Sequence, residues 1–190
     1  MANRYLVTGG AGFIGSHIVM RLVQDGAVVR VVDNLATGQI QRLDRVRSKI
    51  EWVQGDLADE AVAENVVDGM DFVVHQAAIP SVQRSLLDPL GTNQANVVGT
   101  LNLLESSRRA GIRRFVYAAS SSAYGDTEVL PKHEDMPPNR RMRYRSLSAS
   151  VIVSCITICT VWRLSLLDTS MCLGRDKTPI QNILRLFPDS

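Results

Sequence analysis

The sequence has no cysteine before residue 155, and its three cysteines, Cys155, Cys159 and Cys172, all lie towards the C-terminus. A fold formed by the earlier residues therefore needs no disulfide to stabilise it. Residues 140–190 also contain no histidine and no paired acidic residues that could complete a set of four metal ligands around these thiols. We therefore predict no metal site.

A long apolar segment is also absent. The best candidate, residues 151–167, is interrupted by Arg163 and is shorter than the ~18 or more apolar residues that a membrane-spanning helix needs. The chain does not open with a charged segment, an apolar run and a cleavage site, because a glycine-rich turn begins at Gly9. We expect a cytoplasmic protein that has no membrane partner.

The sequence lacks a uniform excess of either charge. Its net charge is +2, but residues 1–139 hold 13 basic and 16 acidic side chains, whereas residues 140–190 hold 8 and 3. The basic excess is confined to the C-terminal part, so we expect no nucleic-acid partner. A length of 190 residues suits one domain with a sizeable core.

The sequence does contain strand-like runs that alternate with helix-like ones. A short apolar run at residues 5–7 precedes a group of glycines, and Ile14, Ile18 and Leu22 then recur at helical spacing. Gly26 is predicted to end that helix. Further strands are predicted at residues 27–33, 51–54, 72–75 and 114–118, and the longest helical stretch at residues 93–109.

This alternation predicts the fold class. Continuous apolar strands separated by helices indicate an α/β fold with a Rossmann-type doubly wound parallel sheet, covered by helices on both faces and joined by right-handed crossovers. We expect at least five parallel strands within residues 4–119. His75 ends one predicted strand, and we interpret it as a buried, hydrogen-bonded histidine without a catalytic role.

The turn after the first strand carries a dinucleotide-binding pattern. Gly9, Gly12 and Gly15 form G-x-x-G-x-x-G between a strand and a helix, and Asp33 ends the second strand 18 residues after Gly15. Glycines let the backbone approach a pyrophosphate, and the helix N-terminus attracts its charge. Asp33 can accept hydrogen bonds from a ribose diol and would repel a 2′-phosphate, which favours NAD over NADP. The alternatives are a simple tight turn and a solvated carboxylate.

Several longer segments resemble one family of enzymes. The sequence resembles the extended short-chain dehydrogenase/reductases, and within them the NAD-dependent nucleotide-sugar epimerase/dehydratase family, with UDP-glucose 4-epimerases as the most similar group. The resemblance covers residues 4–139. It rests on the segments "TGGAGFIGSH", "DNLATG", "GDLAD", "HQAAIPSV" and "NVVGTLNLLESSRRAGIRRFVYAASSSAYGD".

The resemblance implies roles for particular positions. It implies pyrophosphate contacts for Gly9, Gly12, Phe13, Ile14 and Gly15. It implies that Asp33 and Asn34 contact the adenosine ribose and that Asp56 and Leu57 contact the adenine. It implies contacts on the nicotinamide side for Ala77, Ala78 and Asn96. Ser120, four residues before Tyr124, matches the catalytic Ser/Thr that hydrogen-bonds the sugar hydroxyl; the alternative is a polar turn at the end of a strand.

The pattern stops after Asn139. The family requires Y-x-x-x-K on the next helix, where the tyrosine acts as general base and the lysine lowers its pKa. In this chain Tyr144 is followed at the fourth position by Ser148. Residues 1–139 are therefore interpreted as the NAD-binding domain and residues 140–190 as a tail outside the family.

A shift of reading frame accounts for this break. If the third base of each codon is read with the first two of the next, the residues from Arg140 permit P-Y-A-V-S-K. Those from Leu167 permit R-Y-F-N-V-F, and those from Asp176 permit Q-D-P-N-S-E-Y. We expect the tail to be poorly ordered or arbitrarily helical, and the sheet to end at an unpaired edge.

The predicted function follows from the resemblance and from the break. The chain is expected to be the cofactor-binding part of an NAD-dependent UDP-sugar 4-epimerase that has lost its base and its substrate domain. Its small-molecule partner would be a nucleotide sugar, and the family implies a homodimer. The alternatives are a nucleotide-sugar 4,6-dehydratase or decarboxylase, and a non-catalytic NAD-binding module. Ser121 and Ser122 stand where dehydratases usually carry acidic residues, which favours an epimerase.

Overall fold

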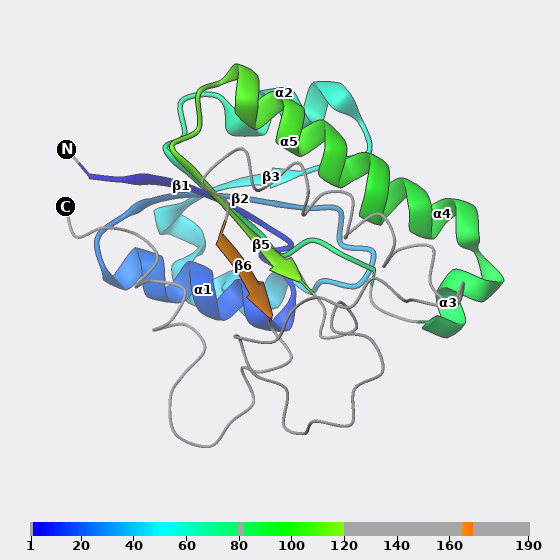
Figure 1. Ribbon diagram of the computed structural model, residues 1–190. Coiled ribbons are helices and arrows are strands. Elements are labelled where there is room, and N and C mark those ends of the chain that lie inside the picture. Colours follow the sequence, from blue (N-terminus) through cyan, green and yellow to red (C-terminus); the bar gives the residue numbers. More distant parts are fainter. Residues whose placement is uncertain (1, 80–81, 120–164, 169–190) are drawn as a thin grey trace, which may run out of the picture.

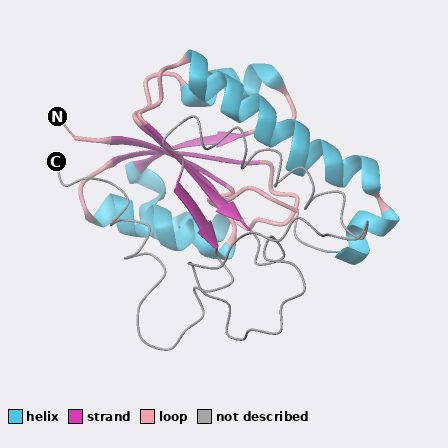
Figure 2. Cartoon of the chain, in the orientation of Figure 1, coloured by secondary structure: helices cyan, strands magenta, loops and turns pink. Residues whose placement is uncertain are grey.

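The computed structural model describes residues 2–79, 82–119 and 165–168. They form an α/β fold in which one twisted sheet lies between two layers of helices (Figures 1 and 2). All neighbouring strands are parallel, in the order β3-β2-β1-β4-β5-β6. The strands are β1 (Arg4–Thr8), β2 (Val28–Asp33), β3 (Ile50–Gln54), β4 (Phe72–His75), β5 (Arg114–Ala119) and β6 (Ser165–Asp168). The predicted parallel sheet of at least five strands is confirmed.

One face of the sheet is covered by helix α1 (Phe13–Gln24) and by the 3-10 helix η1 (Ile40–Lys49). Ile18 and Leu22 of α1 are almost fully buried and pack with Val29 and Val31 of β2. The helical spacing predicted this apolar stripe, although Ile14 at its start stays 37% exposed. Gly26, at φ +79°, ends α1 as predicted, because the left-handed conformation favours glycine.

The opposite face is covered by helices α2 (Glu60–Val67) and α5 (Gly99–Arg109), which lie together in Figure 1. Ala63 and Val66 of α2 and Leu103 of α5 have no exposed surface and pack against Leu6 and Val73 of the central strands. Side chains of one strand point alternately to the two faces, so β1, β2 and β4 contribute to both cores. This explains why apolar residues follow one another in these strands, as in residues 5–7, 31–32 and 72–74.

The predicted helix at residues 93–109 is confirmed and has an irregular beginning. Short helices α3 (Val82–Leu87) and α4 (Pro89–Asn93) lead into a π-helical turn, η2 (Gln94–Val98), which continues directly as α5. Gly99 N donates to the carbonyl oxygen of Gln94, five residues earlier. Such π turns occur frequently at functional sites, and this one lies beside the carboxyl end of β4.

The sheet extends one strand past β5, and among the described residues it ends at β6. Strand β6, from the tail, pairs in parallel with β5, with Ser165 opposite Val116 and Asp168 opposite Ala119. Parallel pairing uses backbone N–H and carbonyl groups, which any sequence without proline supplies. A segment outside the family pattern can therefore still extend the sheet. The rest of the tail lies outside the described residues.

Arg30 of β2 joins the sheet to the C-terminal end of α2. Its Nη1 donates to the carbonyl oxygens of Asn65, Val66 and Asp68 at 3.3, 3.0 and 2.8 Å. Its Nε lies 2.9 Å from Glu51 Oε2, and only 12% of the Arg30 side chain is exposed. A cation that donates to the last carbonyls of a helix satisfies groups that have no partner within the helix.

We expect Arg30→Met to lower the free energy of unfolding by about 1–3 kcal/mol, because it removes charge-assisted hydrogen bonds from a largely buried position. Arg21→Met is the matched control, since Arg21 pairs with Asp25 one turn away at the surface and such pairs contribute only about 0.3–0.5 kcal/mol. Urea unfolding followed by circular dichroism measures both variants. Equal losses would contradict the capping role of Arg30.

Two further observations concern the part of the chain that the structure describes. None of its helices has the length and apolar character needed to cross a membrane. No group of three or more histidine, cysteine or acidic side chains is placed there to hold a metal ion.

Candidate dinucleotide-binding site

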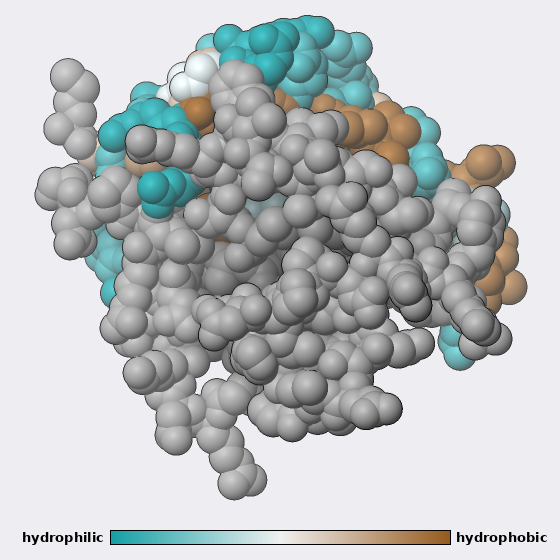
Figure 3. Space-filling view, in the orientation of Figure 1, coloured by the Kyte–Doolittle hydropathy of each residue, from teal (hydrophilic) through white to brown (hydrophobic). Residues whose placement is uncertain are grey.

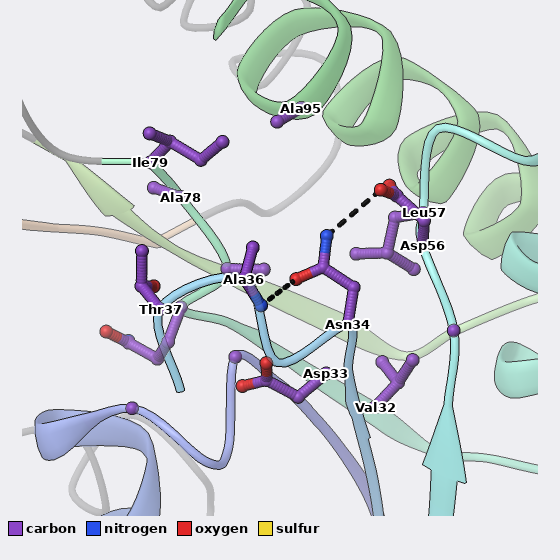
Figure 4. A pocket seen from close by; sticks show the side chains of 15 residues that line it. Val32, Asp33, Asn34, Ala36, Thr37, Asp56, Leu57, Ala78, Ile79 and Ala95 are labelled. Carbon is purple, nitrogen blue, oxygen red and sulfur yellow. Dashed lines mark hydrogen bonds between the residues drawn. The ribbon is translucent and has the colours of Figure 1, made fainter. Parts of the chain in front are cut away.

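A cleft opens at the carboxyl ends of β1 to β4, where the strand order reverses between β1 and β4. In open α/β sheets, ligands bind outside the carboxyl ends of the strands at such a switch point. The cleft contains about 620 Å³ of empty space, open solvent included. It is lined by Gly9, Gly12, Val32, Asp33, Asn34, Ala36, Thr37, Gly55, Asp56, Leu57, Gln76, Ala77, Ala78, Ile79 and Ala95, many of them labelled in Figure 4.

The glycine-rich turn fits tightly between β4 and α1. Gly9 has φ +65°, and a Cβ atom there would lie 2.7 Å from Ala77 N. Gly15, in the first turn of α1, leaves no room for a Cβ because the Gly9 carbonyl oxygen and Gly10 Cα occupy that space. Gly12 precedes α1 without a side-chain cap. The first N–H groups of α1 are therefore left to meet an anion.

Asp33 is held in place by two backbone N–H groups. Its Oδ2 accepts from Ala11 N at 3.0 Å and its Oδ1 accepts from Leu35 N at 2.8 Å. Leu35 has φ +62°, and a Cβ on Gly38 would lie 2.9 Å from both carboxylate oxygens. An ionised carboxylate has about four acceptor sites, so two remain for hydroxyl donors in the cleft.

A second pair of polar side chains joins the ends of β2 and β3. Asn34 Nδ2 donates to Asp56 Oδ2 at 3.0 Å, and Asn34 Oδ1 accepts from Ala36 N at 3.0 Å, as Figure 4 shows. Asp56 Oδ1 accepts from Ala58 N at 2.9 Å. Asn34 and Asp56 thus hold each other across this side of the cleft, with the apolar Leu57 beside them.

Apart from Gln76, the β4 side of the cleft is apolar, and Asn96 of η2 holds it in place. Ala77, Ala78 and Ile79 line it. Asn96 Oδ1 accepts from Ile79 N at 2.8 Å, and its Nδ2 donates to Ile79 O at 3.1 Å. Asn96 therefore acts on this wall by binding its backbone, while its neighbour Ala95 contributes to the lining.

The predicted site residues fall into four groups. Those that line the cleft are Gly9, Gly12, Asp33, Asn34, Asp56, Leu57, Ala77 and Ala78. Gly15 and Asn96 support the lining from behind, whereas Phe13 and Ile14 lie outside it on the exposed first turn of α1, with Phe13 68% exposed. Ser120 lies outside the described residues.

Sequence reasoning missed several lining residues. Most are immediate neighbours of predicted ones: Val32, Gly55, Gln76, Ile79 and Ala95. The first four lie at a strand end or shortly after one, which was a usable signal because the cleft forms where strands end, whereas Ala95 lies in η2. Ala36 and Thr37 gave no such signal. They reach the cleft because the chain turns at Leu35, and Gln39 N then donates to Ala11 O at 2.9 Å.

The interpretation of His75 as buried and satisfied is confirmed. His75 is 2% exposed. Its Nδ1 lies 2.6 Å from Thr8 Oγ1 and its Nε2 lies 3.0 Å from Thr100 Oγ1. Burial lowers the pKa of the imidazole to about 4, so it is neutral near pH 7.

Comparison with known proteins agrees with this geometry. A model of the NAD dependent epimerase/dehydratase family matches residues 5–161. The chain belongs to this family. The predicted family resemblance and Rossmann-type fold are thereby confirmed. The match runs past residue 139, and the boundary between a family domain and a tail at that residue stays a prediction.

Curated members of the family give the scale of the likeness. The UDP-glucose 4-epimerase of Neisseria meningitidis serogroup B is 35% identical over 161 residues, covering 82% of this chain and 48% of that protein. The putative UDP-glucose 4-epimerase of Methanocaldococcus jannaschii is 40% identical over 136 residues, with coverage of 70% and 44%. The chain therefore spans less than half the length of these two relatives.

Solved structures of family members have the same fold. The UDP-glucose 4-epimerase of Thermotoga maritima, solved with UDP-glucose, superposes with a TM-score of 0.73 at 32% identity, covering 86% of this chain and 53% of that one. The Thermus thermophilus enzyme, solved with NAD, superposes with a TM-score of 0.71 at 35% identity, with coverage of 87% and 53%.

Proposed function

We propose that this chain binds NAD in the cleft, with the adenosine half over β2 and β3 and the nicotinamide half over β4. The observation that carries the proposal is Asp33, an anchored carboxylate at the end of β2 with acceptor sites left for a ribose diol. The strand–helix turn can close this tightly only with glycine at positions 9 and 15, because Cβ atoms there would clash with neighbouring backbone. The uncapped first N–H groups of α1 are then available to a pyrophosphate.

The polar groups of the cleft support this placement. Asp56, steadied by Asn34, can accept from an adenine amino group while Leu57 packs against the ring. Among the residues that the structure describes, none pairs with the buried Gln76 Nε2, although Gln76 lines the cleft. Buried polar groups in proteins are nearly always paired. A ligand oxygen in the cleft would satisfy this donor.

NAD is expected to bind this chain at least about tenfold more tightly than NADP, because like charges brought together in a binding site cost several kcal/mol. Asp33 places its carboxylate where the 2′-phosphate of NADP would lie. Asp33→Asn should bring the dissociation constants of NAD and NADP closer together. Calorimetric titration of each cofactor into each variant measures it.

The control for this test is Asp59→Asn, which removes the same charge outside the cleft lining. Asp59 caps α2 by accepting from Ala61 N, and asparagine is an equally good cap. The control should keep the wild-type ratio. Equal affinities of the wild-type chain for NAD and NADP would contradict the role of Asp33, and a folded wild-type chain that binds neither would overturn the proposed function.

We further propose that the chain is the cofactor half of a UDP-hexose 4-epimerase. Bound NAD supplies a hydride acceptor for oxidation of a sugar hydroxyl, and Ser120 is proposed to hydrogen-bond that hydroxyl. The names of the relatives and their length support this proposal. A 4,6-dehydratase or decarboxylase on the same scaffold is the second candidate, and substrate assays of the full-length protein distinguish them.

A homodimer is proposed on the family resemblance. Three leucines of α3 and α4, Leu86, Leu87 and Leu90, are 73%, 87% and 82% exposed, and hydrophobic surface shows in this region of Figure 3. Contiguous exposed apolar surface marks interfaces or causes aggregation. A second copy would bury such surface, and light scattering of the purified chain would separate a dimer from larger aggregates.

The shifted reading frame after Asn139 also stays a proposal. Sequencing the coding DNA across codons 136–146 tests it directly. The shift could lie in the gene or could be an error in the determined sequence. If independent clones all encode the residues of this sequence, an error is contradicted. The frameshift would then be carried by the gene itself.

A further inference from the structure

A continuous set of hydrogen bonds runs through the interior from β1 to the π turn η2. It begins at Thr8, whose Oγ1 accepts from the backbone N–H groups of Gln76 at 3.2 Å and Ala77 at 3.1 Å. The same hydroxyl lies 2.6 Å from His75 Nδ1. Because Thr8 Oγ1 already accepts two bonds, its own hydrogen is donated to Nδ1.

The other side of the imidazole fixes its tautomer. His75 Nε2 lies 3.0 Å from Thr100 Oγ1, and the Thr100 hydroxyl donates its hydrogen to the carbonyl oxygen of Asn96 at 2.8 Å. Thr100 Oγ1 can therefore only accept from His75, so the imidazole hydrogen is on Nε2. Both ring nitrogens are used, and every bond has one donor and one acceptor.

The path closes on the wall of the cleft. The Asn96 side chain exchanges two hydrogen bonds with the backbone of Ile79. Residues 76–79 lie beyond the end of β4 and belong to neither a strand nor a helix. Within the described part of the chain, the backbone of residues 76–79 forms hydrogen bonds with Thr8 and Asn96. His75 and Thr100 connect Thr8 to Asn96 through hydrogen bonds.

We propose that Thr8, His75 and Thr100 are positioning residues that hold residues 77–79 in place for the nicotinamide half of the dinucleotide. The inference rests on the proposed NAD function. Asp33 assigns the adenosine half to the β2 side, so the other half of a ligand that crosses the switch point must lie on the β4 side. None of the three side chains needs to touch the ligand, because each acts through the backbone of residues 76–79.

The test compares Thr100→Val with Thr100→Ser. Valine keeps the shape of threonine but has no hydroxyl, whereas serine keeps the hydroxyl. Each chain is titrated calorimetrically with NAD and with AMP, which contains only the adenosine half. We expect Thr100→Val to weaken NAD about tenfold, as the loss of a buried hydrogen-bond partner does, and to leave AMP within about twofold. Thr100→Ser should restore NAD binding to near the wild-type value.

The outcomes separate the two proposals. Equal weakening of NAD and AMP in Thr100→Val would show a general structural role and overturn the inference, and so would unchanged NAD binding. A wild-type chain that binds AMP but not NAD would overturn the proposed NAD function itself. If the wild-type chain binds NAD but Thr100→Ser binds it as weakly as Thr100→Val does, loss of the hydroxyl is not the cause of the weaker NAD binding. That result would also overturn the inference.

A second measurement covers the case in which Thr100→Val does not fold. The chain has three histidines, so nitrogen-15 NMR of the wild-type imidazole rings can identify His75 and its tautomer. We expect a neutral ring with hydrogen on Nε2, in slow exchange with water. A ring with hydrogen on Nδ1, or one that interconverts between tautomers, would overturn the proposed path.

Discussion

The 190-residue chain is expected to leave UDP-glucose and UDP-galactose unconverted, whereas the same gene re-read in the shifted frame from codon 140 is expected to interconvert them. The 190-residue chain has no Y-x-x-x-K pair, since Ser148 stands four positions after Tyr144, where the lysine would be. The shifted frame permits P-Y-A-V-S-K at this point. Removal of one positioned acid–base group typically costs about 10²–10⁴ in rate, and here both members of the pair are missing.

A second loss acts in the same direction. The chain spans less than half the length of the family relatives that it matches, and we expect that residues which would close over a nucleotide sugar are not among its 190 residues. Without them, binding cannot hold the reacting hydroxyl against the cofactor, and such positioning supplies a large part of enzymatic rate enhancement. We therefore expect activity below detection and not merely a raised KM.

The assay incubates each purified protein with NAD and UDP-glucose, and measures UDP-galactose by chromatography. NAD binding by both proteins is the control. All residues that line the cleft lie between Gly9 and Ala95, and this part of the sequence is the same in both proteins. Robust turnover by the 190-residue chain would contradict the proposed role of the missing pair. A restored protein that is inactive on every UDP-hexose but binds NAD would move the substrate assignment to the dehydratase or decarboxylase branch.

The fold was largely predictable because its signals are local. Apolar runs such as residues 72–75 and the spacing of Ile18 and Leu22 reflect burial between two layers, which any strand or helix in this position must satisfy. Strand β6 was not predictable. It comes from a segment without the family pattern, and it joins β5 through backbone pairing, which leaves little trace in the sequence.

The site was predictable where it depends on backbone geometry near a strand end. Gly9, Gly15 and Asp33 are fixed by the turn and by the end of β2. The contacts between distant segments were not predictable, because spacing along the chain does not report them. Gly38 against the Asp33 carboxylate and Asn96 against Ile79 arise only once the sheet and the π turn have placed these residues together.

The free energy of unfolding is expected to fall by about 3 kcal/mol between pH 6.5 and pH 4 through His75 alone. Burial lowers the pKa of the folded imidazole from 6.5 to about 4, while the unfolded chain has the ordinary value. Between these two values the unfolded state binds a proton that the native state does not. Stability is therefore fully present above pH 6.5 and is lost as the pH falls, by 1.36 kcal/mol per unit of pKa difference.

Comparison with His75→Gln isolates this contribution, because the carboxylates titrate in both proteins. The variant should be less stable at pH 7, since a flexible amide replaces the rigid ring that contacts both Thr8 and Thr100, but its stability should depend less steeply on pH. Urea unfolding at half-unit steps from pH 7 to pH 4 measures the two slopes, and parallel curves would contradict the prediction. If the variant does not fold, NMR titration of the wild-type ring decides: half-protonation of folded His75 near pH 6.5 would show that burial does not hold the imidazole neutral.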